Sequence, residues 1–289
     1  MATGTGSGAR VLRVLRSAGS FLGVIVLTYL GLLAVTFFIG RVIPIDPVLA
    51  IVGDRAPEHV YARVREELGL NKPLWEQFYI YLSKVLSGDF GTSVLTSNPV
   101  MQDILRTFPA TIELATLGII LGAGIGIPLG VWAAVRRGSM VDQVVRVIGL
   151  VGYSVPIFWL GLMALVLFYA KLGWVAGPGR IDVGYEFSVT LVSGFLLLDT
   201  ARAGNWEAFR NVLSHLILPA SLLGYFSLAY ISRMTRSFML NELAQEYVIA
   251  ARAKGLSESR IIWRHALRNA MVPLVTVVAL SYACLLYTS

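Results

Sequence analysis

Charged residues are scarce in this sequence, and cysteine is almost absent. Asp, Glu, Lys and Arg make up only 14% of the 289 residues, whereas ordinary soluble domains carry about 25%. Hydrophobic residues make up 56%, and the mean hydropathy is +0.71. These values exclude an ordinary soluble domain and predict a membrane protein. The single cysteine, Cys284, excludes an internal disulfide and any cysteine-cluster metal site.

The sequence also lacks the patterns of two common functional sites, a histidine metal site and a phosphate-binding loop. The three histidines, His59, His215 and His265, lie far apart in the sequence, so a metal site is not expected. No Gly-Lys dipeptide occurs, which excludes the G-x-x-x-x-G-K-[ST] loop that cradles phosphate in ATPases. We therefore expect no catalytic residue, metal or cofactor in this chain. The net charge of +7 does not by itself indicate nucleic acid, because positive charge on one side of a membrane sets topology.

Long apolar runs are what the sequence has in abundance. A run of roughly 18 or more apolar residues is long enough to cross a bilayer. On this basis we expect an all-α, polytopic membrane helix bundle with four full transmembrane helices and an incomplete fifth. The first helix should span residues 20–43, and the others should lie near 111–135, 147–170, 213–234 and 271–289.

The flanking charges predict the orientation of these helices. Residues 1–19 hold arginines and no acid, so this tail should be cytoplasmic. Residues 44–109 carry six Lys or Arg against eight Asp or Glu, as expected of an extracytoplasmic loop. Residues 233–268 carry seven basic against three acidic residues, so they should return to the cytoplasm. Within the outer loop, the segments Pro57–Gly69 and Pro73–Gly88 have the pattern of amphipathic helices, either as a packed cap or as a docking surface.

Two features inside the predicted spans concern packing and passage. Glycine recurs at every fourth position from Gly118 to Gly130, which would allow another helix to approach closely. The motif GYSVPIFW contains Tyr153, Ser154 and Pro156. Its proline should kink the third span, and these three residues are our candidates for lining a translocation path.

The predicted spans carry no charged side chain near their centres, where an ion-coupled carrier would bind its coupling ion. Glu113, His215 and Arg146 sit only at predicted helix ends, whereas ion-coupled carriers usually bind the ion within the membrane. If the protein moves a solute uphill, the energy should enter through another protein. A channel or an ion-coupled secondary transporter remains the alternative function, and a membrane anchor that only binds partners is a third.

The most basic run, residues 236–270, predicts two helices joined by an elbow. Gly255 should end the first helix by adopting a positive φ, and Ser257 is a plausible N-cap of the second. A DNA-reading helix-turn-helix is disfavoured, because both ends enter the membrane. A segment lying on anionic lipid is a second interpretation. A socket for a cytosolic partner fits best, because a rigid elbow can transmit displacement.

The segment EYVIAARAKGLSESRIIWRHALRNAMVPLVT, residues 246–276, closely resembles the signature cytoplasmic loop of ABC importer permeases, in the branch for dipeptide, oligopeptide and nickel uptake. ELGLNKPLWEQFYIYLSKVLSGDFGTSV and the segment from Pro109 to Leu162 resemble the same branch. The ending SYACLLYTS does not, so we expect a truncated chain that lacks a complete fifth and a sixth helix.

The resemblance implies a type I importer permease in the bacterial inner membrane. Such a permease pairs with a second, homologous permease, binds two cytosolic ATPase subunits that hold the ATP and Mg, and receives substrate from an extracytoplasmic binding protein. Ala250, Ala251 and Gly255 match the alanine-alanine and glycine positions of the family loop. The stretch Ala253 to Ile262 should form the coupling helix, with these members: Ala253, Lys254, Gly255, Leu256, Ser257, Ile261 and Ile262.

Overall fold

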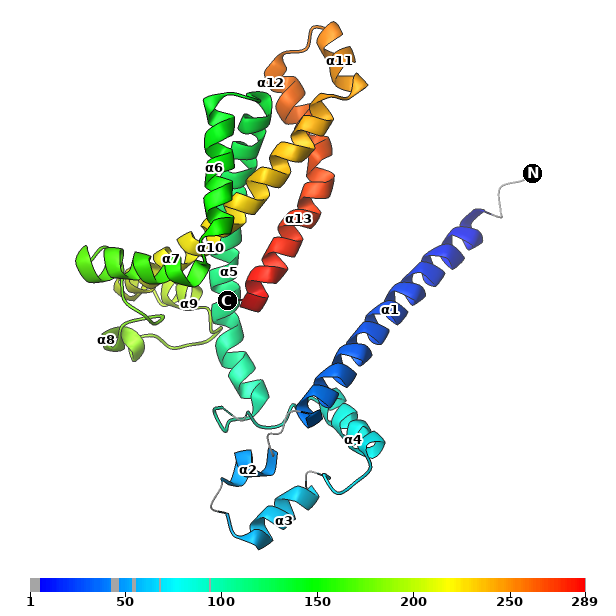
Figure 1. Cartoon of the computed structure of the whole chain (residues 1–289), viewed down its shortest axis with the longest axis vertical. Helices are drawn as coiled ribbons and strands as arrows, with labels where there is room; N and C mark the ends of the chain where they lie inside the picture. The colour runs from blue at the N-terminus through cyan, green and yellow to red at the C-terminus, as the bar shows by residue number, and fades with distance from the viewer. Residues whose placement is uncertain (1–5, 43–46, 54–55, 68, 94, 289) are drawn as a thin grey trace. The chain divides into compact units, whose positions relative to one another are not determined.

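The computed structural model describes the chain except for residues 1–5, 43–46, 54–55, 68, 94 and 289. The described residues form helices joined by turns and loops, with no strand and one isolated β-bridge between Thr92 and Pro99. The chain divides into two compact units, Met1–Ile104 and Leu105–Ser289 (Figure 1). The expected all-α class is therefore confirmed.

The first unit consists of one long apolar helix and three shorter ones. α1 (Gly6–Val42) begins well before the span expected at residues 20–43, so most of the basic tail is helical rather than a separate segment. α2 (Pro47–Val52), α3 (Glu58–Glu67) and α4 (Leu74–Leu86) follow. The latter two lie within the segments whose pattern predicted amphipathic helices.

One face of α4 packs against the end of α1. The ring of Phe37 on α1 lies 5.3 Å from the ring of Phe78 and 5.6 Å from that of Tyr81, measured between centroids. Trp75 and Tyr79 lie on the opposite face and are exposed. α4 thus forms a cap over α1 with one face and leaves an aromatic face open.

The second unit is a bundle in which α10 is central. α5 (Val100–Val135), α6 (Met140–Ser154), α10 (Trp206–Leu243) and α13 (Leu267–Thr288) are its long members (Figure 1). α10 packs against both α6 and α13. The largest apolar cluster joins residues of α5, α10 and α13: Ala115, Ile119, Leu223, Ile231, Leu274, Val277 and Leu285.

The glycine repeat of α5 faces α10, as the sequence predicted. A Cβ atom added to Gly122 would lie 2.4 Å from the Cβ of Ser227, and one added to Gly130 would lie 2.5 Å from the carbonyl oxygen of Ser232. Real side chains cannot approach so closely, so the two helices touch backbone to backbone at these positions.

The third predicted span, 147–170, is not one straight helix. α6 ends at Ser154, and α7 (Ile157–Ala164) continues into a π-helix (Leu165–Lys171) after a bend of 96°. Val155 and Pro156 are both extended, with ψ angles of 124° and 132°. Proline has no backbone N–H and disfavours a helical conformation in the residue before it. The expected kink is therefore a complete break.

Four described helices are long and apolar enough to cross a membrane, or five spans if the bent pair counts as one: Arg16–Gly40, Val100–Val135, Trp206–Leu243, Glu258–Tyr287 and the pair Met140–Gly152 with Ile157–Lys171. The helix expected near 271–289 is thus among the long ones, and the span near 147–170 is the broken one.

α8 (Val183–Glu186) and α9 (Leu196–Arg202) lie at one end of the second unit, and α11 (Glu246–Ala253) lies at the other (Figure 1).

Candidate functional site

The elbow is built from α11, a four-residue turn, α12 (Glu258–Arg260) and a π-helix (Ile261–Ala266) that continues into α13. The prediction of a single coupling helix over Ala253 to Ile262 is wrong. Ala253 ends α11, and residues 254–257 form the turn. The helix that precedes this turn is α11, which begins seven residues before the predicted start.

Gly255 explains why the chain turns here. Its φ is +75°, a left-handed conformation that costs a side-chain-bearing residue about 1 kcal/mol. The N–H of Gly255 donates to the carbonyl of Arg252 at 2.9 Å, and the N–H of Leu256 donates to that of Ala251 at 3.2 Å. These bonds close the end of α11. Ser257 holds the expected N-cap position in an extended conformation, but its hydroxyl makes no capping hydrogen bond within the described chain.

A small apolar cluster holds the two arms of the elbow together. Val248 and Ala251 on α11 and Ile261 at the start of the second arm are buried against one another. Leu256 and Tyr247 pack on this cluster. Ala251 and Ile261 therefore act inside the elbow, where a larger residue in place of Ala251 would push the arms apart.

An ion pair across the elbow escaped the sequence analysis. The Arg252 guanidinium donates to both carboxylate oxygens of Glu258, at 2.8 and 3.2 Å. The carboxylate hydrogen bond and charge raise the pKa of Arg252 above its usual value. The two residues are six positions apart, a spacing that no helical period pairs, so only the turn at Gly255 brings them together.

The exposed side chains of the elbow include small and apolar residues together with charged ones, among them Arg252, Lys254 and Glu258. Ala250, Ala253, Lys254 and Gly255 are exposed. Ile249, which the sequence analysis did not select, is 63% exposed. Leu256, Ser257 and Ile262 are exposed or half-buried. A compact protrusion with an exposed isoleucine and little steric bulk can seat in a cleft of another protein, but it carries no group arranged for bond chemistry.

The candidates for a translocation path lie at the break between α6 and α7. Pro156 precedes the first residue of α7. Ser154 is exposed, and its hydroxyl donates to the carbonyl of Leu150 at 2.9 Å, within its own helix. The side chain of Tyr153 lies outside the described part of the chain. The break region packs on α10, where the Tyr225 hydroxyl donates to the carbonyl of Ile148 at 3.0 Å.

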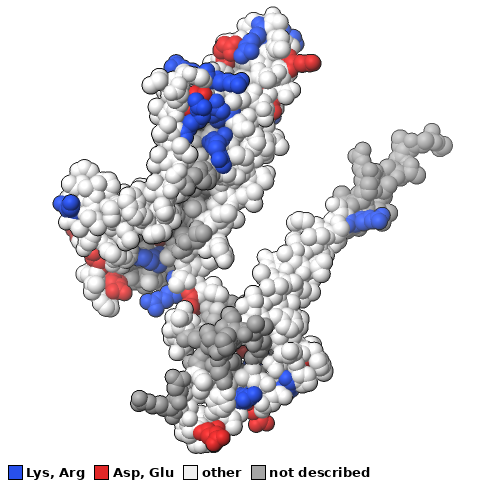
Figure 2. Space-filling model, in the orientation of Figure 1, with Lys and Arg blue, Asp and Glu red and all other residues white. Residues whose placement is uncertain are grey.

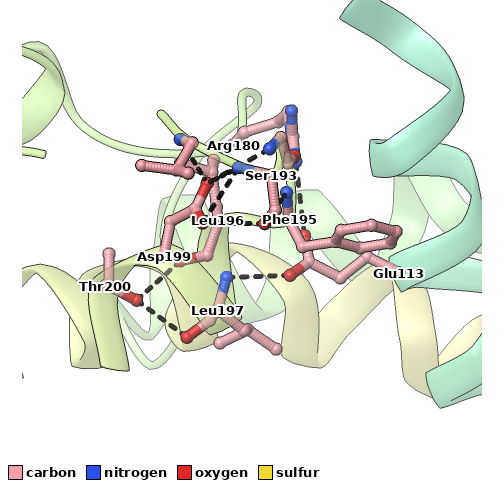
Figure 3. A network of polar contacts seen from close by, with 10 residues as sticks. Glu113, Arg180, Ser193, Phe195, Leu196, Leu197, Asp199 and Thr200 are labelled. Atoms are coloured by element: carbon pink, nitrogen blue, oxygen red, sulfur yellow. Dashed lines mark hydrogen bonds and ion pairs between the residues drawn. The ribbon is translucent and has the colours of Figure 1, made fainter. Parts of the chain in front are cut away.

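A buried polar network lies at the opposite end of the second unit (Figure 3). Glu113 of α5 accepts hydrogen bonds from the Leu197 N–H at 2.8 Å and from Arg180 at 3.3 Å. Asp199 accepts from the backbone N–H groups of residues 192–194. Burial raises the pKa of Asp199, but the Ser193 hydroxyl and these N–H donors outweigh burial, so its pKa lies below the usual value. This network fixes the loop before α9 onto α5.

The same loop borders a cavity of about 750 Å³ that has both polar and apolar lining residues. Its charged lining residues are Arg106, Arg180 and Glu186, so it presents both signs of charge. Arg180 is shared with the network of Glu113. Within the described chain, no group of three or more His, Cys, Asp or Glu side chains is placed to hold a metal ion.

Comparison with known proteins covers almost the whole chain. Residues 126–288 match the family described as "Binding-protein-dependent transport system inner membrane component", and residues 12–115 match the N-terminal family of the same membrane components. Together the two matches include the bundle, the elbow and α1.

Several curated proteins are similar over nine-tenths of the chain. The probable D,D-dipeptide transport system permease protein DdpB of Escherichia coli K12 is 44% identical over 91% of this chain and 77% of its own length. The di/tripeptide permease DppB of Pseudomonas aeruginosa is 42% identical over 92% of this chain and 79% of its own. The dipeptide permease DppB of E. coli K12 has the same identity and coverage.

Proposed function

Because the chain belongs to the inner-membrane components of binding-protein-dependent transport systems, we propose that it carries short peptides across the membrane and takes its energy from ATPases docked on the elbow. It is a permease subunit of an ABC importer and not an enzyme. The proposal extends to its partners: a second permease that completes the path, two cytosolic ATPases that bind ATP and Mg, and an extracytoplasmic binding protein.

The single observation that carries the docking proposal is the exposed face of the elbow. Ile249 and Ala250 are exposed on one face of α11, while Val248 and Ala251 of the same helix are buried against the second arm of the elbow. A helix that is anchored on one face and open on the other moves as a body with α10 and α13. Force applied by a closing ATPase dimer would reach the bundle through these helices, as alternating access requires.

Peptides are the proposed cargo because the relatives are named as dipeptide and di/tripeptide permeases. The cavity lined by Arg106, Arg180 and Glu186 lies at the end of the bundle opposite the elbow. A short peptide has a free carboxylate and a free ammonium group, which such a mixed lining can accommodate. In the proposed orientation, with the N-terminus and the elbow cytoplasmic, this cavity faces the binding protein.

The test is Gly255→Asp in the assembled transporter. Nothing lies within 4 Å of a Cβ atom built at Gly255, and aspartate tolerates a positive φ better than most residues. The variant should therefore fold, while its carboxylate blocks the docking face. Gly204→Asp is the matched control, because Gly204 has a φ of +65° and equally open surroundings at the other end of the unit.

The expected result is loss of ATPase co-purification and at least a tenfold loss of labelled dipeptide uptake for Gly255→Asp, with both retained for Gly204→Asp. Normal co-purification and uptake by the elbow variant would overturn the docking proposal. Uptake driven by a proton or sodium gradient in vesicles without any ATPase would instead support an ion-coupled carrier.

A further inference from the structure

A basic cavity is lined by residues of α6 and α10 near the elbow end of the bundle. It has a volume of about 390 Å³ and is lined by these residues: Val145, Arg146, Gly149, Leu150, Arg233 and Arg236. Three of the six are arginines, and this lining contains no carboxylate. Gly149 contributes to the wall on α6, and a Cβ atom there would lie at an ordinary contact distance, 3.7 Å, from the carbonyl oxygen of Ala229.

One buried carboxylate engages part of this positive charge. Asp142 accepts two hydrogen bonds from Arg236, at 2.5 and 2.8 Å, and the Nε atom of Arg146 lies 3.9 Å from it. The Arg233 guanidinium lies 5.9 Å from the centre of the Tyr230 ring. The Asp142 carboxylate thus lies against Arg236 and near Arg146, while the lining of the cavity itself presents three guanidinium groups.

The cavity continues onto an apolar surface. Val144, Val147, Leu150 and Val151 of α6 are large hydrophobic residues that are exposed. They lie on a helix that belongs to a candidate membrane span. Figure 2 shows basic atoms gathered over the part of the bundle near the elbow, with a long uncharged surface beyond them. A polar, cationic recess next to an apolar wall matches the two parts of a phospholipid.

We propose that this cavity binds the phosphate headgroup of an anionic phospholipid, whose acyl chains lie along the exposed valines and Leu150 of α6. Guanidinium groups bind phosphate oxygens in a planar, bidentate geometry, and basic recesses between membrane helices on the cytoplasmic side favour anionic headgroups. A soluble anion would need the arginines but not the apolar wall, so the wall distinguishes the two sources of phosphate.

The test measures lipid retention by native mass spectrometry of the detergent-solubilised full chain, titrated with phosphatidylglycerol or phosphatidylcholine. The variant is Arg146→Gln with Arg233→Gln. Arg236 is left in place, because its removal would strand the buried Asp142 carboxylate. The control is Arg137→Gln with Arg260→Gln, which removes the same charge near the elbow from residues that do not line the cavity.

The wild-type chain should retain phosphatidylglycerol over phosphatidylcholine, and the cavity variant should bind phosphatidylglycerol about tenfold more weakly or worse. The control should change by less than about twofold. If the double variant folds poorly, Arg146→Gln alone gives the same comparison, because this side chain is 60% exposed. The single variant should bind phosphatidylglycerol several-fold more weakly than the wild-type chain.

Three outcomes would overturn the proposal. Equal retention of the two lipids would exclude a headgroup site for anionic lipid. Equal losses of phosphatidylglycerol binding in the cavity and control variants would show that general surface charge, and not the cavity, attracts the lipid. Complete displacement of phosphatidylglycerol by millimolar inorganic phosphate would assign the cavity to a soluble anion.

Discussion

At the residue scale, the sequence revealed the turn of the elbow but not the ion pairs in and beside it. Gly255 was recognisable from the sequence, because a glycine after a helical pattern predicts a C-terminal turn with positive φ, and the turn has φ of +75°. The ion pair of Arg252 and Glu258 was not recognisable, because residues six positions apart come into contact only once the chain turns at Gly255. Asp142 and Arg236 were also missed, since 94 residues separate them.

Burial should decide how much these two ion pairs contribute to stability. Arg236→Gln is expected to lower the free energy of unfolding by roughly 3 kcal/mol, because it leaves the Asp142 carboxylate, with 2% of its side chain exposed, without its main partner. Arg252→Gln should lower it by less than about 1 kcal/mol, because both partners are about half exposed. Reversible unfolding in mixed detergent measures both. Equal effects would mean that burial does not set the strength of these pairs.

At the element scale, periodicity located the helices better than it located their ends and breaks. The glycine repeat of α5 correctly predicted a close helix contact, because spacing alone places those residues on one face. The extent of the break at Pro156 was not predictable, because proline in a membrane helix produces anything from a slight bend to a full interruption. The coupling helix was misplaced for a related reason: Gly255 was recognised as a breaker, yet the family resemblance extended the helix across it.

The close contact between α5 and α10 gives a sharp substitution test. Gly122→Leu should destabilise the bundle by about 1–3 kcal/mol or more, because even a Cβ atom at this position would lie 2.4 Å from that of Ser227. Gly124→Leu is the control on the same helix, since nothing lies within 4 Å of a Cβ atom there, and it should be close to neutral. The midpoint of thermal unfolding compares the two. A control as unstable as Gly122→Leu would show that helix propensity or lipid contact, rather than the α10 interface, is responsible.

At the scale of the whole molecule, basic residues are distributed unevenly among the segments that join the apolar helices. The turn after α5 and the elbow are rich in arginine, whereas the segment from 171 to 211 holds four basic and four acidic residues. This asymmetry could be read from the sequence because the positive-inside preference depends only on which loops carry Lys and Arg. The basic cavity beside α6 could not be predicted, because its arginines come from two helices that are far apart in the sequence.

The proposed orientation predicts which loops a membrane-impermeant thiol reagent reaches. In a Cys284→Ser background, Lys254→Cys on the elbow should react only in inverted vesicles, and Arg202→Cys at the end of α9 should react only in right-side-out vesicles, because the two residues lie at opposite ends of the bundle. Both native side chains are on the protein surface, so a cysteine at either position costs little packing. Detergent-permeabilised vesicles provide the reference for full labelling. Reaction of Lys254→Cys in right-side-out vesicles would place the elbow outside, where no ATP-hydrolysing partner could reach it, and the docking proposal would fail together with the orientation.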